Sequence, residues 1–135
     1  MVESIFLKIA RKEIPVHIIY EDENCLSFLD VKPHAKGHTL VIPKKEGVTI
    51  FDFEEETLKN LMIAVKNTMA RLQEVLSPDG FNVGWNHNTA GGQVVPHLHV
   101  HIMPRWQGDG GGSMHSIISN PGKISVDKVA ELFKI

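Results

Sequence analysis

The stretch His97-Leu98-His99-Val100-His101-Ile102-Met103 carries a histidine at every second position, with apolar residues between them. Successive side chains of a β-strand point to opposite faces, so the three histidines are expected on one face and the apolar side chains on the other. Neighbouring imidazole rings would then lie roughly 7 Å apart. The pattern predicts a strand over residues 94–103 that buries one face and presents three titratable rings on the other.

The segments around this stretch alternate between strand and helix signals. Further strands are expected from short apolar runs bounded by turn residues, at 17–20, 25–29, 38–42 and 81–86. Residues 54–76 predict a long helix. Its apolar stripe consists of Leu58, Leu61, Met62, Val65, Met69, Leu72 and Leu76. Short helices are expected after Ser4, over 5–11, and after Ser125, over 126–133. This order predicts an α+β fold, a mainly antiparallel five-stranded sheet with the long helix across one face.

Composition restricts the function classes. The 135 residues are expected to form one domain, and the formal charge of −2 argues against a nucleic-acid partner. The sequence contains neither an apolar run of transmembrane length nor a signal-peptide pattern, so no membrane association is expected. Cys25 is the single cysteine, which excludes an internal disulfide and favours a cytoplasmic location. The glycine run at 108–112 predicts a flexible loop.

The histidine face admits three interpretations: a solvated polar face, a metal site or a catalytic row. Histidines at i and i+2 of a strand can bind one zinc ion, with His38 as a ligand from another strand. A neutral imidazole near its usual pKa of about 6.5 is also a nucleophile that can attack phosphorus. The histidines alone give the metal and catalytic interpretations nearly equal weight.

The loop ahead of the histidines, residues 86–93, adds context. Gly91 and Gly92 allow backbone N–H groups to approach an anion closely, and Asn86 and Gln93 supply neutral donors. Taken alone, such a loop is more typical of an ordinary hairpin connection. Followed by a histidine ladder, it indicates a phosphate held where an imidazole can attack.

These residues resemble the histidine triad nucleotide-binding family, whose signature is His-x-His-x-His followed by two apolar residues. The resemblance covers about residues 4–106, in the motifs at 5–6, 12–15, 28–30, 37–44, 91–93, 97–103, 104–106 and 108–110. It implies a single histidine triad domain over residues 1–135, with a core at about 4–106 followed by a glycine-rich loop and C-terminal helix at 107–135. Family members are usually homodimers with the long helix and a strand at the interface, which the apolar stripe of 54–76 suits.

The resemblance also implies roles for individual residues. His99 matches the nucleophile, which forms a nucleotidyl-histidine intermediate, and His97 and His101 match flanking histidines that contact phosphate oxygens. His38 matches a fourth active-site histidine. Matches to the substrate site are Asn86, Gln93 and Gly92 at the phosphate, Asp30 at the ribose hydroxyls, and Phe6, Ile9, Phe28 and Val31 at the purine.

Several of these residues have another explanation. Phe6, Ile9 and Phe28 are more simply explained as core. Asp30, before a proline-containing turn, is typical of an Asx turn, and His38 of a surface histidine. The resemblance favours the functional role only for Asp30, His38 and the triad.

Two sets of positions depart from the family pattern. Many prokaryotic members bind a structural zinc through Cys-x-x-Cys, a later histidine and a triad histidine. The first three of these positions hold Ser4, Leu7 and Glu46 here, so no zinc is expected. The phosphoramidase branch carries a hydroxyl side chain just after the glutamine. The corresponding Val94 weakens the expectation of efficient phosphoramidase activity.

The sequence therefore predicts a nucleotidyl hydrolase or transferase that needs no cofactor. Its substrate would be a purine nucleoside phosphoramidate or a dinucleoside polyphosphate, attacked at the α-phosphate. The alternatives are a nucleotide-binding sensor or scaffold with little turnover and, more weakly, a metalloenzyme centred on the four histidines. The cleft residues do not distinguish adenine from guanine.

Overall fold

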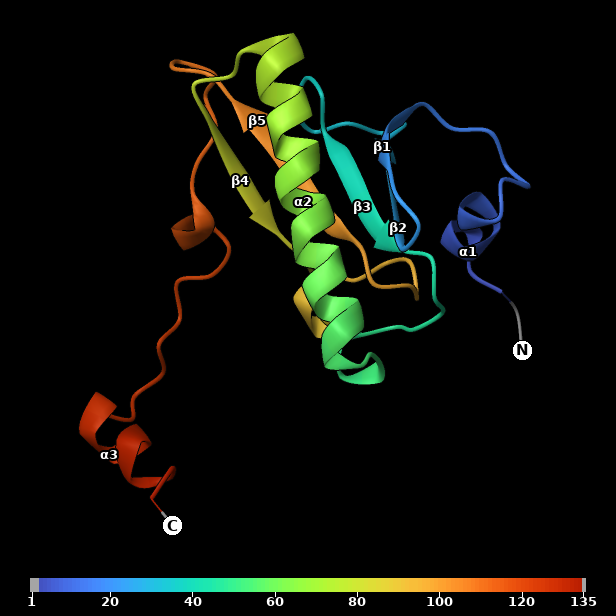
Figure 1. Cartoon of the computed structure of the whole chain (residues 1–135). Coiled ribbons are helices and arrows are strands. Elements are labelled where there is room, and N and C mark those ends of the chain that lie inside the picture. Colours follow the sequence, from blue (N-terminus) through green and yellow to red (C-terminus); the bar gives the residue numbers. More distant parts are fainter. Residues whose placement is uncertain (1–2, 135) are drawn as a thin grey trace.

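A computed structural model describes residues 3–134 and contains a five-stranded sheet (Figure 1). The strands are β1 (Ile18–Glu21), β2 (Cys25–Leu29), β3 (Thr39–Pro43), β4 (Gly80–Gly84) and β5 (Val100–Arg105). Their spatial order is β1-β2-β3-β5-β4, and every neighbouring pair is antiparallel. The predicted α+β fold, a mainly antiparallel five-stranded sheet with one long helix, is confirmed.

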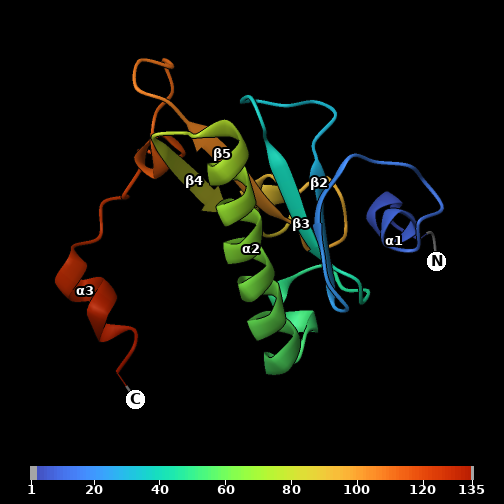
Figure 2. The ribbon, with the colours of Figure 1, turned by 45° about the horizontal axis from the view of Figure 1, so that its top comes forward.

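Different helices cover the two faces of the sheet, because side chains alternate along each strand. The long helix α2 (Glu55–Leu76) packs on the face that contains Val41 and Ile102. The short helix α1 (Ile5–Ala10) packs on the opposite face, where its Phe6 joins buried side chains of β2 and β3. Figure 2 shows the two helices on opposite sides of the sheet. The α1 face is also the face that carries His99 and His101.

Both helices begin close to the predicted positions. The Ser4 hydroxyl accepts a hydrogen bond from the Leu7 backbone N–H at 3.1 Å, which caps α1. In α2 the predicted stripe packs on the sheet with Leu61, Val65 and Leu72 buried and Leu58, Met69 and Leu76 half-buried, whereas Met62 is 57% exposed. No helix in the described part of the chain combines the length and the apolar character needed to cross a membrane.

A polar contact inside the core fixes α2 against β2. The hydroxyl groups of Thr68 and Ser27 are hydrogen-bonded at 3.0 Å, and both side chains are fully buried. Thr68 also reaches the Ala64 carbonyl oxygen of its own helix at 2.7 Å. These bonds satisfy polar atoms that would otherwise oppose burial.

The predicted strand over 94–103 was wrong at both ends, because β5 runs from Val100 to Arg105. Ahead of Val100 the backbone does not form sheet hydrogen bonds. The Leu98 N–H instead donates to the Gly47 carbonyl oxygen at 2.9 Å, and Pro96 has no N–H to donate. At the other end Pro104 is accommodated because β3 pairs with β5 only as far as Ile102. The strand β4 ends at Gly84, so Trp85 and Asn86 lie beyond it.

The glycine-rich segment 108–112, which was expected to be a flexible loop, is folded around Asp109. Its carboxylate accepts two hydrogen bonds from the Arg105 guanidinium, each 2.8 Å long, and others from the backbone N–H groups of Trp106 and Gly111. A side chain at Gly111 would displace the Arg105 guanidinium from its place beside Asp109. The following helix α3 (Val126–Glu131) lies apart from the sheet (Figure 1).

Candidate active site

His99 is an oriented imidazole with one free ring nitrogen. Its Nδ1 lies 2.6 Å from the carbonyl oxygen of His97. A carbonyl oxygen only accepts, so Nδ1 carries the proton and Nε2 keeps a lone pair in the neutral ring. The ring is 6% exposed, and its edge contacts the Phe6 ring at a centroid distance of 4.9 Å.

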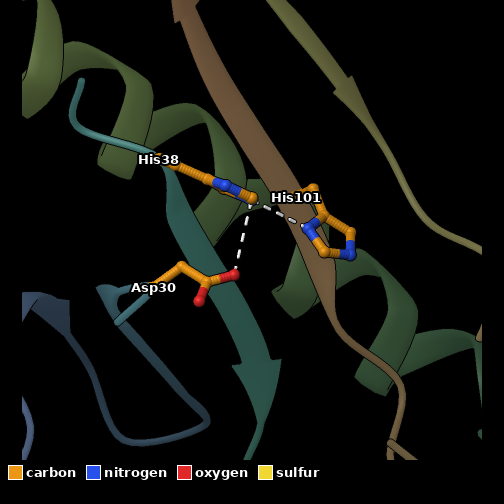
Figure 3. Close-up of side chains that lie close together, drawn as sticks. All are labelled: Asp30, His38 and His101. Atoms are coloured by element: carbon orange, nitrogen blue, oxygen red, sulfur yellow. Dashed lines mark hydrogen bonds and ion pairs between the residues drawn. The ribbon is translucent and has the colours of Figure 1, made fainter. Parts of the chain in front are cut away.

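His101 is held in one tautomer by its contact with His38. The His101 Nδ1 and the His38 Nε2 are 2.9 Å apart (Figure 3). The His38 Nδ1 accepts the His34 backbone N–H at 3.1 Å, so the proton of neutral His38 lies on Nε2 and is donated to His101. His101 then carries its own proton on Nε2. Its ring centroid lies 5.0 Å from that of His99, so the two rings are in edge contact.

Burial keeps these rings neutral. It lowers the pKa values of His38, His97 and His99 from the usual 6.5, because a buried imidazolium loses its hydration. Burial, then the neighbouring His99 and His38, lower the pKa of His101 to about 4. At neutral pH the site therefore presents an unprotonated nucleophile and an N–H donor rather than a row of cations.

Asp30 lies directly after β2, where it forms the predicted Asx turn and also approaches His38. One carboxylate oxygen accepts the Lys32 backbone N–H at 2.9 Å, which is an Asx turn, and the other lies 3.7 Å from the His38 Nε2 (Figure 3). Ligand atoms of Asp30, His38 and His101 all lie within 4.8 Å of one another, as a metal site would require. A tetrahedral zinc would hold two imidazole nitrogens ~3.3 Å apart. The 2.9 Å separation of these two matches a shared proton instead.

His97 lies on the α1 side of the sheet like the other two rings, but it is closed off from the site rather than presented on an open face as predicted. It is fully buried, with Nε2 2.9 Å from the Pro43 carbonyl oxygen and Nδ1 3.4 Å from the Ser4 hydroxyl. The irregular backbone ahead of β5 turns it toward α1. His97 therefore ties α1 to the end of β3, and its carbonyl oxygen orients His99.

The zinc site of prokaryotic relatives does not fit these residues. Ser4 is bonded to the His97 ring and to the Leu7 N–H, Leu7 is packed in the core, and Glu46 is exposed. The one imidazole at this position already uses both nitrogens on protein groups. No thiolate is present here to bind the ion.

Gln93 holds the loop rather than offering a donor. Its amide nitrogen donates to the carbonyl oxygens of Val48 at 2.8 Å and Val95 at 3.1 Å, and its side-chain oxygen accepts the Asn88 N–H at 2.9 Å. Both amide protons are thus used inside the protein. Gln93 was expected at the phosphate, but the structure places it as a brace behind the loop.

The loop amides are also used within the loop. The N–H groups of Gly91 and Gly92 bond to the carbonyl oxygens of Asn88 and Thr89 at 3.1 and 3.0 Å. Gly92 adopts a φ of +94°, which favours glycine, and a side chain there would contact Asn86. Asn86 is half-buried and lies on the wall of the same cavity as His101, as its predicted role requires.

The residues predicted to hold a purine divide into two groups. Phe6, Ile9 and Phe28 are buried in the core under α1, although the Phe6 edge borders His99. Val31 is 81% exposed beside Asp30. Core packing thus accounts for Ile9 and Phe28, while Phe6 and Val31 remain available to border a ligand.

Sequence reasoning missed a cavity of about 830 Å³ that opens beside His101. Lys36 and Trp106 line it, together with His38 and Asn86. The available signal was proximity in sequence, since Lys36 lies two residues ahead of His38 and Trp106 directly follows β5.

Known proteins share both the motif and the fold. The family model of the HIT domain matches residues 11–108. An uncharacterized HIT-like protein of Methanocaldococcus jannaschii is 45% identical over 106 residues, which cover 78% of this chain and 81% of that protein.

Solved structures agree. The crystal structure of a hypothetical histidine triad nucleotide-binding protein of Sulfolobus tokodaii matches with a TM-score of 0.74 and 39% identity, over 77% of this chain and 70% of that one. A HIT family hydrolase of Legionella pneumophila matches with a TM-score of 0.66 and 40% identity, over 75% of this chain and 91% of that one. With the buried histidine ladder between helix and sheet, these matches establish that the chain belongs to the HIT domain family.

Proposed function

We propose that this protein hydrolyses or transfers the nucleotidyl group of purine nucleotide derivatives through a covalent intermediate on His99. Proteins of the HIT domain family are in general nucleotide-binding hydrolases and transferases. The observation that carries the proposal is the 2.6 Å bond from His99 Nδ1 to the His97 carbonyl oxygen. It fixes the proton on one nitrogen and leaves the lone pair of the other for attack.

In the first step His99 Nε2 attacks the α-phosphorus, a P–N bond forms, and the bond from phosphorus to the leaving group breaks. The ring becomes positively charged, which the His97 carbonyl oxygen stabilises through Nδ1–H. The Nε2–H of His101 donates to a phosphoryl oxygen as negative charge develops. In the second step water attacks the phosphorus, the P–N bond breaks, its electron pair returns to Nε2, and a proton is released.

The remaining contacts divide between binding and positioning. Asn86 contacts the phosphate, Asp30 accepts from the ribose hydroxyls, and Phe6 with Val31 borders the purine. His38 acts through His101, while Gln93 and Gly92 hold the loop in shape.

The proposal includes a homodimer and a cytoplasmic location. Two exposed apolar residues of α2, Met62 and Ile63, adjoin a hollow of about 120 Å³ lined by Leu58, Leu61 and Trp85. The neighbouring strand β4 is an edge of the sheet. An open edge beside apolar side chains favours pairing with a second copy.

The test uses one variant and two substrates. Wild type and His99→Ala are incubated with adenosine 5′-phosphoramidate and with diadenosine tetraphosphate, and intact-protein and peptide mass spectrometry searches for an adenylyl adduct on His99. We expect turnover and an adduct with wild type. His99→Ala should lose turnover but still bind AMP in equilibrium dialysis.

The matched control is His17→Ala, because the side chain of His17 is exposed and does not line the cavity beside His101. It should behave as wild type. Unchanged turnover in His99→Ala would refute the nucleophile. Nucleotide binding by wild type with neither adduct nor product would instead favour a sensor or scaffold.

A further inference from the structure

The cavity beside His101 begins at Asp30 and Asn86, the proposed ribose and phosphate contacts, and extends to Lys36 and Trp106, whereas the purine-bordering Phe6 and Val31 do not line it. The Phe6 ring contacts the His99 ring, and the His99 ring in turn contacts the His101 ring. His101 lines the cavity, whereas Phe6 and His99 do not. A nucleotide whose purine borders Phe6 and whose α-phosphate meets His99 would therefore direct its leaving group toward this cavity.

The size of the cavity indicates a large leaving group. Its volume is about 830 Å³, within the range of about 300–1,000 Å³ typical of pockets that hold drug-sized molecules. Ammonia or a single phosphate would leave most of it filled with water. The cavity suits a group as large as a second nucleotide.

The walls combine an aromatic ring with a cation. The Lys36 ammonium lies 5.8 Å from the centroid of the Trp106 ring, and both residues line the cavity. The ion pairs formed within residues 3–134 do not include Lys36. Met103, Met114 and Ile117 supply apolar wall nearby.

Two of the other charges on the wall are already compensated. Arg105 and Asp109 neutralise each other through the paired bonds that fold the 108–112 loop. The carboxylate of Asp30 also lines the cavity, beside His38. The uncompensated charge at the Trp106 end is therefore positive, which favours an anionic leaving group and disfavours a cationic one such as an aminoacyl amine.

We propose that Lys36 and Trp106 form a leaving-group subsite for an anionic, aromatic group, namely a nucleoside polyphosphate. Lys36 contacts the bridging phosphates, and Trp106 provides a ring on which any base can stack. This inference rests on the proposed function. The balanced reaction of a dinucleoside tetraphosphate breaks one P–O bond, transfers one nucleotidyl group to His99 and releases a nucleoside triphosphate. Water then releases the nucleoside monophosphate.

The test compares two substrates that share the adenylyl group but differ in leaving group. Values of kcat/KM are measured for diadenosine tetraphosphate and adenosine 5′-phosphoramidate with wild type, Lys36→Ala, Trp106→Leu and Trp106→Phe. Lys36→Ala and Trp106→Leu should each lower kcat/KM for the dinucleotide by about tenfold or more, as loss of one charged or stacking contact implies. The phosphoramidate value should change less than about twofold, and Trp106→Phe should restore most of the dinucleotide value.

The control Lys45→Ala removes an exposed lysine that does not line the cavity. It should leave kcat/KM unchanged for both substrates. The subsite would be overturned if these substitutions at Lys36 and Trp106 lowered kcat/KM equally for both substrates, or if they left kcat/KM for the dinucleotide unchanged.

Dinucleotide and AMP affinities are also measured by calorimetry in a His99→Ala background, with and without Lys36→Ala. Selective weakening of the dinucleotide supports the subsite even if wild type shows no turnover. Equal dinucleotide affinities with and without Lys36→Ala would overturn the subsite. Because this measurement needs no turnover, it distinguishes failure of the subsite from failure of the proposed activity.

Discussion

At the scale of single residues, the chemistry depends on which ring nitrogen carries a proton. The sequence spacing brings His99 and His101 to one face, but it does not distinguish Nδ1 from Nε2. The His97 carbonyl oxygen decides this for His99, and the chain from His34 through His38 decides it for His101. The partner of His101 is His38, which comes from a distant part of the chain. The partner of His99 is a backbone carbonyl oxygen, whose direction a sequence pattern does not predict.

The role of His38 can be tested by removing its Nε2–H donor or replacing it with an amide N–H. His38→Ala should lower kcat about tenfold with little change in KM, because one hydrogen bond that fixes the His101 tautomer is lost. His38→Gln, whose amide N–H can take the place of Nε2–H, should recover much of kcat. Steady-state kinetics across pH checks this, and equal losses in the two variants would argue for a merely structural role.

At the scale of elements, the histidine segment contains two parts that the sequence pattern merged into one strand. Its second half is β5, and its first half is irregular chain held by Gly47 and Pro43. The pattern correctly predicted that Leu98, Val100 and Ile102 are buried, but it predicted neither the burial of His97 and His99 nor the hydrogen bonds of the first half. The loop at 108–112 shows the converse, since its glycines permit a tight fold around Asp109 as readily as disorder.

The joint between α2 and β2 gives a stability prediction. Thr68→Val should lower the free energy of unfolding by about 1 kcal/mol, because the buried Ser27 hydroxyl loses one of its two hydrogen-bond partners while the shape of the core is kept. Urea denaturation followed by circular dichroism measures this. Thr89→Val, the same exchange at an exposed loop position, should stay within about 0.5 kcal/mol of wild type. Equal effects of the two exchanges would mean that the buried bond contributes nothing.

At the scale of the whole molecule, the buried histidines make stability depend on pH. The folded-state pKa of His101 is about 4, below the usual imidazole value of 6.5 that applies in the unfolded chain. Between these values the unfolded state binds a proton that the folded state does not, so the free energy of unfolding falls as the pH falls. His101 alone should account for about 3 kcal/mol across this window, and the lowered pKa values of His97, His99 and His38 act in the same direction.

Thermal unfolding at intervals from pH 7.5 to pH 4 measures this effect. The melting temperature should be nearly constant above pH 6.5 and should fall below it. His101→Gln should show a shallower decline. A melting temperature that does not change between pH 6.5 and pH 4.5 would mean that the rings are not held neutral.

Zinc content follows from the contacts of His97. Protein purified without chelators should contain far less than one zinc per chain, because both His97 nitrogens bond to protein groups and no thiolate stands beside them. Inductively coupled plasma mass spectrometry measures this ratio. One zinc per chain, released together with a loss of thermal stability, would contradict the prediction.

The oligomeric state tests the exposed apolar part of α2. Wild type should sediment as a dimer of the 15.1 kDa chain, and Met62→Glu should shift it to monomer by placing a charge against the hollow beside Trp85. Arg71→Glu, which changes charge at an exposed position farther along α2, should remain dimeric. A wild-type monomer at micromolar concentration would refute the proposal.

The sequence by itself determined the fold class, the two faces of the sheet and the histidines that gather on one of them. Hydrophobic periodicity and caps such as Ser4 act over a few residues, so a local pattern suffices to predict them. Only the tertiary structure decided that His97 is a buried tie, that Gln93 is a brace, and that His99 and His101 hold opposite tautomers. It also brought Lys36 and Trp106 to one cavity. Hydrogen-bond partners and cavity walls come from segments distant in sequence, and their positions are fixed only when the sheet and helices pack together.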